Sequence, residues 1–88
     1  MYEISFSEDA LGEFEELDGS VKKVFAKHIK KISNNPPKKF LGGGSGIAVE
    51  WVGQGKIACR VNESENEIRI LHIFTTHKEY EAWYRMLL

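Results

Sequence analysis

The stretch that most constrains the fold of this 88-residue chain is EIRILHIF, residues 67–74. Apart from Glu67 at its start, Arg69 and His72, it presents apolar residues to both sides of a strand. A strand that is apolar on both sides belongs in the middle of a sheet with cover on each face. The rest of the chain is therefore expected to supply neighbouring strands and the helices that cover them.

Three further segments are predicted to be strands: residues 2–6, 46–52 and 56–62. The first alternates apolar and polar residues with the period of a half-buried strand. The second and third are joined by GQG (53–55), which is typical of a tight turn. The third also alternates, which places Ile57, Cys59 and Val61 on one face and Lys56, Ala58, Arg60 and Asn62 on the other.

Helical periodicity is clearest in residues 21–32, and NNPP (34–37) ends this helix because proline cannot continue it. Its apolar stripe is predicted to contain Val21, Val24, Phe25, His28, Ile29 and Ile32. A shorter helix is expected to begin after Ser7, a suitable N-cap, and to end at DGS (18–20). Its stripe is Ala10, Leu11, Phe14 and Leu17.

The C-terminal residues 78–87 are predicted to form a third helix with Tyr80, Trp83, Tyr84 and Leu87 on one side. Trp83 and Leu87 are expected to pack this helix onto the sheet. Together the elements predict a single α+β domain over residues 1–88 with the order β-α-α-β-β-β-α. The expected architecture is a small antiparallel sheet with a helical hairpin on one face and a C-terminal helix. The last three strands form its meander.

The charges of the chain are divided between its first two predicted helices. The net charge is −1, but residues 1–19 hold seven acids and no base, whereas residues 20–40 hold seven lysines and no acid. This favours a dipolar surface, although two solvated helices that pair across a hairpin would explain it equally well. The single cysteine excludes an internal disulfide framework, and no signal or membrane-spanning segment is evident. A cytoplasmic protein without membrane association is expected.

Two familiar ligand sites are disfavoured by the sequence. GGGSG (42–46) lacks the Lys-Ser/Thr of a phosphate loop and precedes a strand, so residues 38–46 are expected to be a flexible connector. The three histidines, His28, His72 and His77, have no ligand-like spacing, so neither a metal nor a cofactor is expected. His28 is expected to be a packing residue with a satisfied ring.

Two cations on one strand face give the first candidate chemistry. Lys56 and Arg60 share a face of their strand, and Glu50 and Arg69 are expected beside them on neighbouring strands. Two such cations could bind a phosphate and stabilise charge that develops in phosphoryl transfer. A solvated polar face is the competing interpretation, and the residues alone leave both open.

The segment HKEYEAWY (77–84) gives the second candidate, because it emerges at the end of the central strand. His77 and Tyr84 are suitable proton-transfer groups, and an aromatic ring such as Tyr80 can stack a base. The competing interpretation is that both tyrosines pack in the core and His77 merely begins a helix.

Taken together, NNPP, KKFLGG, GKIACRV, IRILHIF and HKEYEAWY, in this order, resemble the RelE/ParE superfamily of type II toxin–antitoxin toxins. The order β-α-α-β-β-β-α is that family's fold, and THKEY is also similar to the tail of HigB-type toxins. RelE-type members are ribosome-dependent mRNA endonucleases that promote attack of a ribose 2′-OH on the adjacent phosphate. The resemblance implies catalytic roles for Lys56, Lys78 and Tyr84, to which side-chain chemistry adds Arg60 and His77.

The resemblance also implies partners and leaves alternatives. A cognate antitoxin would wrap the helical hairpin, and the ribosome and mRNA would be the targets. Because the chain is slightly acidic, a ParE-like inhibitor of DNA gyrase that catalyses nothing on RNA stays open. So does a degenerate homologue that only binds an antitoxin.

Overall fold

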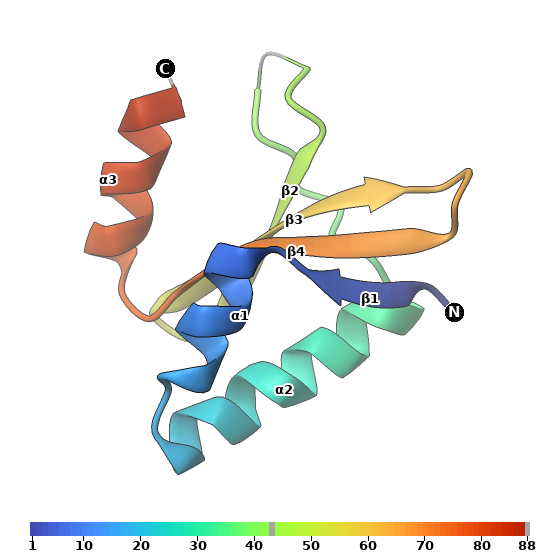
Figure 1. The fold of residues 1–88 in the computed structure, drawn as a ribbon. Helices are drawn as coiled ribbons and strands as arrows, with labels where there is room; N and C mark the ends of the chain where they lie inside the picture. Colours follow the sequence, from blue (N-terminus) through green and yellow to red (C-terminus); the bar gives the residue numbers. More distant parts are fainter. Residues whose placement is uncertain (43, 88) are drawn as a thin grey trace.

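The computed structural model describes residues 1–42 and 44–87 of the chain. Its elements follow the predicted order, which confirms the α+β class (Figure 1). They are β1 (Glu3–Phe6), α1 (Glu8–Glu15), α2 (Gly19–Asn34), β2 (Ile47–Val52), β3 (Gly55–Asn62), β4 (Glu67–Phe74) and α3 (His77–Leu87).

The four strands form one sheet in the order β1-β4-β3-β2. The apolar strand β4 lies inside the sheet, as predicted, and β2, β3 and β4 form the expected antiparallel meander. The prediction of a wholly antiparallel sheet is wrong for one pair, since β1 runs parallel to β4. The helical hairpin follows β1, so no tight turn forces β1 to be antiparallel to its neighbour.

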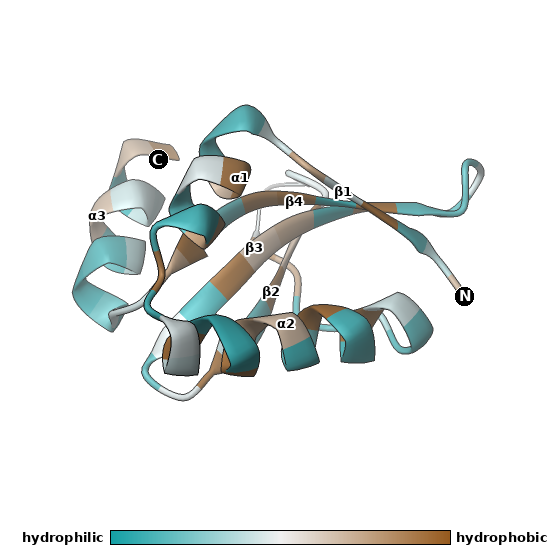
Figure 2. Ribbon diagram, turned by 60° about the horizontal axis from the view of Figure 1, so that its bottom comes forward, coloured by the Kyte–Doolittle hydropathy of each residue, from teal (hydrophilic) through white to brown (hydrophobic). Residues whose placement is uncertain are grey.

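Helices cover both faces of the sheet, unequally. Helix α2 lies against one face of the sheet (Figure 2). The main core lies between them, where Phe25, Ile29 and Ile32 join inward residues of β3 and β4, including Cys59. A smaller cluster on the other face centres on Phe74, with Trp83 of α3 packed against it. No residue of α3 is fully buried, so this helix is the more loosely held cover.

Helices α1 and α2 both begin at side-chain caps; α1 begins after Ser7 as predicted, whereas α2 begins at Gly19, before its expected start at Val21. The Ser7 hydroxyl accepts from the Ala10 amide at 3.0 Å, and Asp18 accepts from the Val21 amide at 3.0 Å. The predicted apolar stripes are too wide, however. Val24 is 49% exposed and Leu11 is 47% exposed, because the helices meet the sheet along a narrower line than residue spacing suggested.

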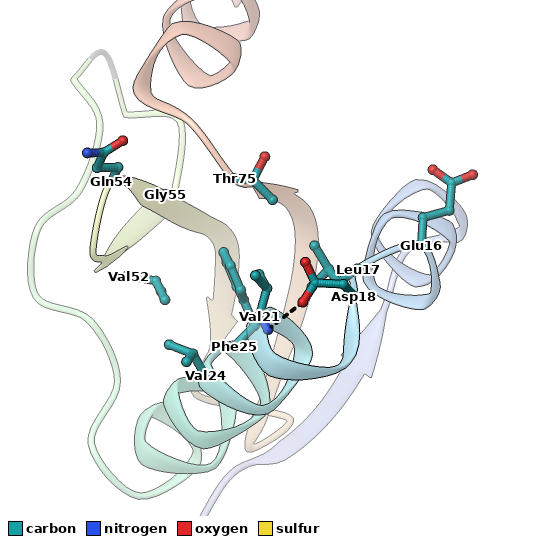
Figure 3. A pocket seen from close by; sticks show the side chains of 10 residues that line it. All are labelled: Glu16, Leu17, Asp18, Val21, Val24, Phe25, Val52, Gln54, Gly55 and Thr75. Atoms are coloured by element: carbon teal, nitrogen blue, oxygen red, sulfur yellow. Dashed lines mark hydrogen bonds between the residues drawn. The ribbon is translucent and has the colours of Figure 1, made fainter.

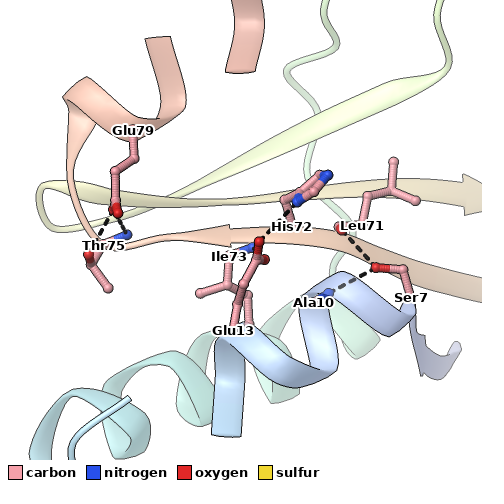
Figure 4. Close-up of polar contacts among 8 residues, drawn as sticks. All are labelled: Ser7, Ala10, Glu13, Leu71, His72, Ile73, Thr75 and Glu79. Atoms are coloured by element: carbon pink, nitrogen blue, oxygen red, sulfur yellow. Dashed lines mark hydrogen bonds and ion pairs between the residues drawn. The ribbon is translucent and has the colours of Figure 1, made fainter. Parts of the chain in front are cut away.

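Helix α1 takes over from β1 along the edge of β4 (Figure 4). Beyond the last paired residue of β1, Ser7 donates from its hydroxyl to the Leu71 carbonyl at 2.8 Å. Glu13 then accepts from the Ile73 amide at 2.8 Å and contacts His72 Nδ1 at 3.1 Å. The open edge of β4 is thereby satisfied by side chains of a helix.

The segment before β2 is more ordered than a free connector. Leu41 donates to the Ile47 carbonyl at 2.8 Å, and Val49 donates to the Lys39 carbonyl at 3.0 Å. Residues 39–41 thus run antiparallel beside β2, which corrects the expectation of a flexible connector for that part of 38–46; Gly43 lies outside the described residues. Among the described residues, no helix is long and apolar enough to cross a membrane.

Candidate active site

Lys56 lies near the start of β3, on the sheet face that α3 covers. Contrary to the competing interpretation of a solvated polar face, it is only 2% exposed. Its ammonium lies 2.8 Å from His77 Nδ1, 4.2 Å from the centre of the Trp51 ring and 4.9 Å from the centre of the Tyr80 ring. We call these three neighbours, Trp51, His77 and Tyr80, the lysine cage.

Local sequence accounts for each wall of the lysine cage. The two-residue turn between β2 and β3 begins with Gly53 at a φ of 61° and pairs Trp51 directly with Lys56. The other two members lie on α3, which begins at His77 because Thr76 and Glu79 form a capping box. The Thr76 hydroxyl accepts from the Glu79 amide at 3.2 Å, and the Glu79 carboxylate accepts from the Thr76 amide at 3.2 Å.

The Glu79 carboxylate also accepts from both the amide and the hydroxyl of Thr75, at 3.1 and 2.9 Å (Figure 4). The side-chain hydrogen bond from Thr75 is the largest cause that lowers the pKa of Glu79. The charge therefore stays at the positive end of the α3 dipole, where it stabilises the helix start.

The cage changes the acid–base properties of its members. Burial lowers the pKa of Lys56, and the positive charge of Lys39 acts in the same direction, whereas the Glu81 carboxylate raises it. Burial also raises the pKa of Tyr80. An ammonium whose charged form is disfavoured gives up its proton more readily than a solvated lysine does.

Hydrogen bonding fixes the tautomer of His77 in this arrangement. A lysine ammonium has three donors and no acceptor, so His77 Nδ1 must accept from Lys56. The ring proton is then on Nε2, which lies 3.1 Å from Glu81 Oε1. Glu81 also pairs with Arg85 at 3.5 Å.

Arg60 and Tyr84 lie further along the same face. Arg60 is exposed, sits directly opposite Arg69 of β4, and donates to the Ser45 carbonyl at 3.5 Å. Arg60 and Tyr84 both line a cavity of about 630 Å³, together with Leu41, Gly42, Ser45, Ile47 and Leu87. The Tyr84 ring stacks on Tyr80, with centroids 6.0 Å apart and planes 16° apart, so Tyr80 connects this cavity to the lysine cage.

The structure thus brings four of the five predicted site residues into two adjoining groups, Lys56 with His77 and Arg60 with Tyr84. Lys78 is exposed on α3, and adjacent helix positions face different directions, so it stands apart from the cage. Leu87, expected to pack α3 onto the sheet, is half exposed at the cavity, whereas Trp83 packs as predicted.

Glu50 is not on this face, which corrects its expected place beside Lys56. It pairs with Ile57, a core residue, and accepts from Lys31 at 3.1 Å. His28 Nδ1 also lies 3.1 Å from the Glu50 carboxylate. The His28 ring is thus satisfied by a polar partner on β2, and it is only partly buried, unlike the buried apolar residues of its helix stripe.

The sequence interpretation missed two members of the site, although both had a signal. Trp51 lies opposite Lys56 in the register that the two-residue turn Gly53–Gln54 dictates. Glu81 follows His77 by four residues, the spacing at which helical side chains meet. Within the part of the chain that the structure describes, no group of three or more His, Cys, Asp or Glu could hold a metal ion.

A second hollow lies on the opposite side of the sheet, between the α1–α2 junction and the β2–β3 turn (Figure 3). Its volume is about 450 Å³. Apolar side chains such as Val24 and Phe25 line it, and Glu16 and Asp18 stand at its rim. The hydrogen bond from the Val21 amide is the largest cause that lowers the pKa of Asp18, so this rim stays negative.

Comparison with known proteins places this geometry in context. No family model matches the chain. It is 46% identical over 35 residues to a candidate RelE-like toxin of Escherichia coli; the alignment covers 40% of this chain and 37% of that protein. The matched segment therefore spans little more than a third of that relative's length.

Solved structures show the likeness over the whole chain. The fold is similar to the isolated RelE toxin of Escherichia coli, with a TM-score of 0.78, 16% identity and full coverage of both chains. It is also similar to the intact Escherichia coli RelBE toxin–antitoxin complex, with a TM-score of 0.77 and 16% identity over 88% of this chain and 99% of that chain. The chain therefore has the RelE fold.

Proposed function

We propose that the protein is the toxin of a toxin–antitoxin pair and that it acts as a ribosome-dependent mRNA endonuclease. The observation that carries the proposal is the lysine cage beside a cationic sheet face within a RelE fold. Lys56 has a lowered pKa, and Arg60 and Arg69 lie directly across from each other nearby. A proton-transfer group and a phosphate-binding surface are the two requirements of RNA cleavage by its own ribose.

In the proposed reaction, the ribose 2′-oxygen forms a bond to phosphorus and the bond from phosphorus to the 5′-oxygen breaks. Neutral Lys56 accepts the 2′-OH proton, and the departing 5′-oxygen receives a proton from His77. The products are a 2′,3′-cyclic phosphate and a 5′-hydroxyl. Arg60 neutralises the phosphate, and Tyr84 stacks a base at the cavity that it lines with Arg60.

Access to Lys56 requires that one wall of the lysine cage move. Trp51 is 52% exposed, and its ring, which lies 4.2 Å from the ammonium, is proposed to be the wall that turns outward. Stacking of the displaced ring on a nucleobase would replace the cation–π contact that it loses. A ribosome-bound mRNA would supply such a base, which places the reaction in the cytoplasm.

The antitoxin is proposed to cover the helical hairpin. The hollow with Glu16 and Asp18 at its rim offers apolar walls and negative charge, so a basic amphipathic segment would suit it. The RelBE structure to which this fold is similar is itself a toxin–antitoxin complex, which supports a protein partner of that kind.

The test is inducible expression in a bacterial host, with primer extension on abundant mRNAs and a plasmid supercoiling assay. Wild type should arrest growth and create new mRNA ends, and Lys56→Met should do neither while accumulating as folded protein. Glu65→Gln, an exposed change in the β3–β4 turn, serves as the matched control and should behave as wild type. Arrest with altered supercoiling and no new ends would instead assign a gyrase inhibitor. Absence of arrest by abundant, folded wild type would refute the toxin proposal.

A further inference from the structure

We infer that Glu81 is a positioning residue for the lysine cage: it holds the His77 ring so that Nδ1 accepts from Lys56, and it stabilises the proton when it moves to His77. The geometric part of this inference is independent of any reaction, and its catalytic consequence rests on the proposed function. Nothing in the resemblance to toxins assigned a role to this residue.

The contacts of His77 determine which of its two ring nitrogens bears the proton. Lys56 can only donate, so one nitrogen of His77 is committed as an acceptor at 2.8 Å. The other nitrogen bears the proton and lies 3.1 Å from Glu81 Oε1, within ion-pair distance. Because the ring has a polar contact at each nitrogen, Glu81 favours the ring orientation that the tautomer set by Lys56 requires.

Charged groups surround the proton that Lys56 and His77 share. Among the residues that the structure describes, Glu81 is the one carboxylate that shifts the pKa of Lys56, and Lys39, whose ammonium lies 5.2 Å from the centre of the Trp51 ring, opposes it. Tyr80 presents a ring face to the ammonium, and Arg85 holds the far oxygen of Glu81. When the ring takes a proton, the imidazolium has the Glu81 carboxylate as its ion-pair partner at 3.1 Å.

The consequence is an internal proton exchange that conserves charge. When the shared proton moves from Lys56 to His77 Nδ1, Lys56 becomes a neutral amine and His77 becomes an imidazolium paired with Glu81. The amine then accepts the 2′-OH proton of the substrate, and the imidazolium returns one proton to the departing 5′-oxygen. Lys56 ends charged and His77 ends neutral, which is the starting state.

Two substitutions of Glu81 separate geometry from charge. Glu81→Gln keeps an amide oxygen that can accept from Nε2 but removes the charge, whereas Glu81→Ala removes both. Purified protein is studied by nuclear magnetic resonance of the Lys56 ammonium, whose protons are visible only while burial and a hydrogen bond protect them from exchange with water. The matched controls are Glu65→Gln and Glu65→Ala, which make the same changes at an exposed turn position.

The inference expects the protected Lys56 signal in wild type and Glu81→Gln and its loss in Glu81→Ala. It also expects a lower pKa of Lys56 in Glu81→Gln than in wild type, because the carboxylate that raises this pKa is gone. If the Glu81 variants and the Glu65 controls have the same protection of the Lys56 ammonium protons and the same pKa of Lys56, the positioning role of Glu81 is refuted. Both readouts are made without RNA.

Activity supplies the catalytic half of the test. If neutral Lys56 is the base, the ascending limb of kcat against pH should move to lower pH in Glu81→Gln while KM stays unchanged. A folded wild type without nuclease activity would defeat the proposed function, yet the resonance data would still decide whether Glu81 positions the cage. An active enzyme whose pH profile ignores Glu81→Gln would overturn the catalytic consequence alone.

Discussion

Replacement of Lys56 tests whether its charge is needed for the stability of the fold or only for the chemistry of the site. The replacement is Lys56→Met, which keeps an unbranched side chain of similar length and removes the charge. In the folded protein Lys56 is 2% exposed, so its ammonium has lost nearly all of its hydration. Burying a charge destabilises a fold unless its partners compensate for the lost water.

The partners of Lys56 are few enough to estimate. A hydrogen bond to a charged group contributes roughly 1.5–3 kcal/mol, and each cation–π contact contributes about 0.5–2 kcal/mol. One bond to His77 and two aromatic faces thus supply about 2.5–7 kcal/mol, against a desolvation cost of several kcal/mol. The opposing terms are of similar size, so Lys56→Met should change the free energy of unfolding by less than about 1.5 kcal/mol.

Lys56→Ala is expected to behave differently, because it also empties a packed space and should cost about 2–4 kcal/mol. Urea unfolding followed by far-ultraviolet circular dichroism measures both, with the exposed Lys78→Met as a control that should leave stability unchanged. If Lys56→Met is as destabilised as Lys56→Ala, the charge itself stabilises the fold and the reasoning is wrong. If it is stable, it is the proper variant for asking whether the charge is needed for activity.

Three other outcomes are expected. Gly55→Ala should destabilise the fold by about 2 kcal/mol or more, measured by urea unfolding, because a Cβ there would overlap a β4 carbonyl and a core ring. Burial raises the pKa of the Cys59 thiol from an ordinary 9.0 to about 12, so its contribution to stability is full below pH 9 and lost as pH rises toward 12. Iodoacetamide should therefore alkylate it at neutral pH only after unfolding; rapid labelling of folded protein would contradict its burial. Glu13→Ala should speed hydrogen exchange of the Ile73 amide and cost about 1 kcal/mol, whereas Glu16→Ala should leave that amide unchanged.

Much of the framework was accessible from residue patterns. Segment 67–74, which is apolar on both sides, required a central strand. Ser7 caps a helix, and GQG forms the turn between two strands, both as predicted. Each of these features is local, or depends on which faces must be covered. The parallel pairing of β1 with β4 depends instead on where the helical hairpin returns the chain to the sheet, and no local residue pattern indicates that position.

The candidate site was predicted less completely, for two physical reasons. Alternation placed Lys56 and Arg60 on one face, but it could not show that α3 buries the first and leaves the second exposed. The position of Glu50 depends on the register between β2 and β3, not on alternation within one strand: a two-residue turn that pairs Trp51 with Lys56 must pair Glu50 with Ile57. The catalytic roles of the site residues remain predictions.

The most direct measurement of the central claim is cleavage by purified protein of mRNA on translating ribosomes, with the new ends identified by mass spectrometry. The account predicts that wild type leaves 2′,3′-cyclic phosphate and 5′-hydroxyl ends, and that equally folded Lys56→Met leaves the mRNA intact. Cleavage by Lys56→Met at the wild-type rate, or intact mRNA with folded wild type, would contradict it.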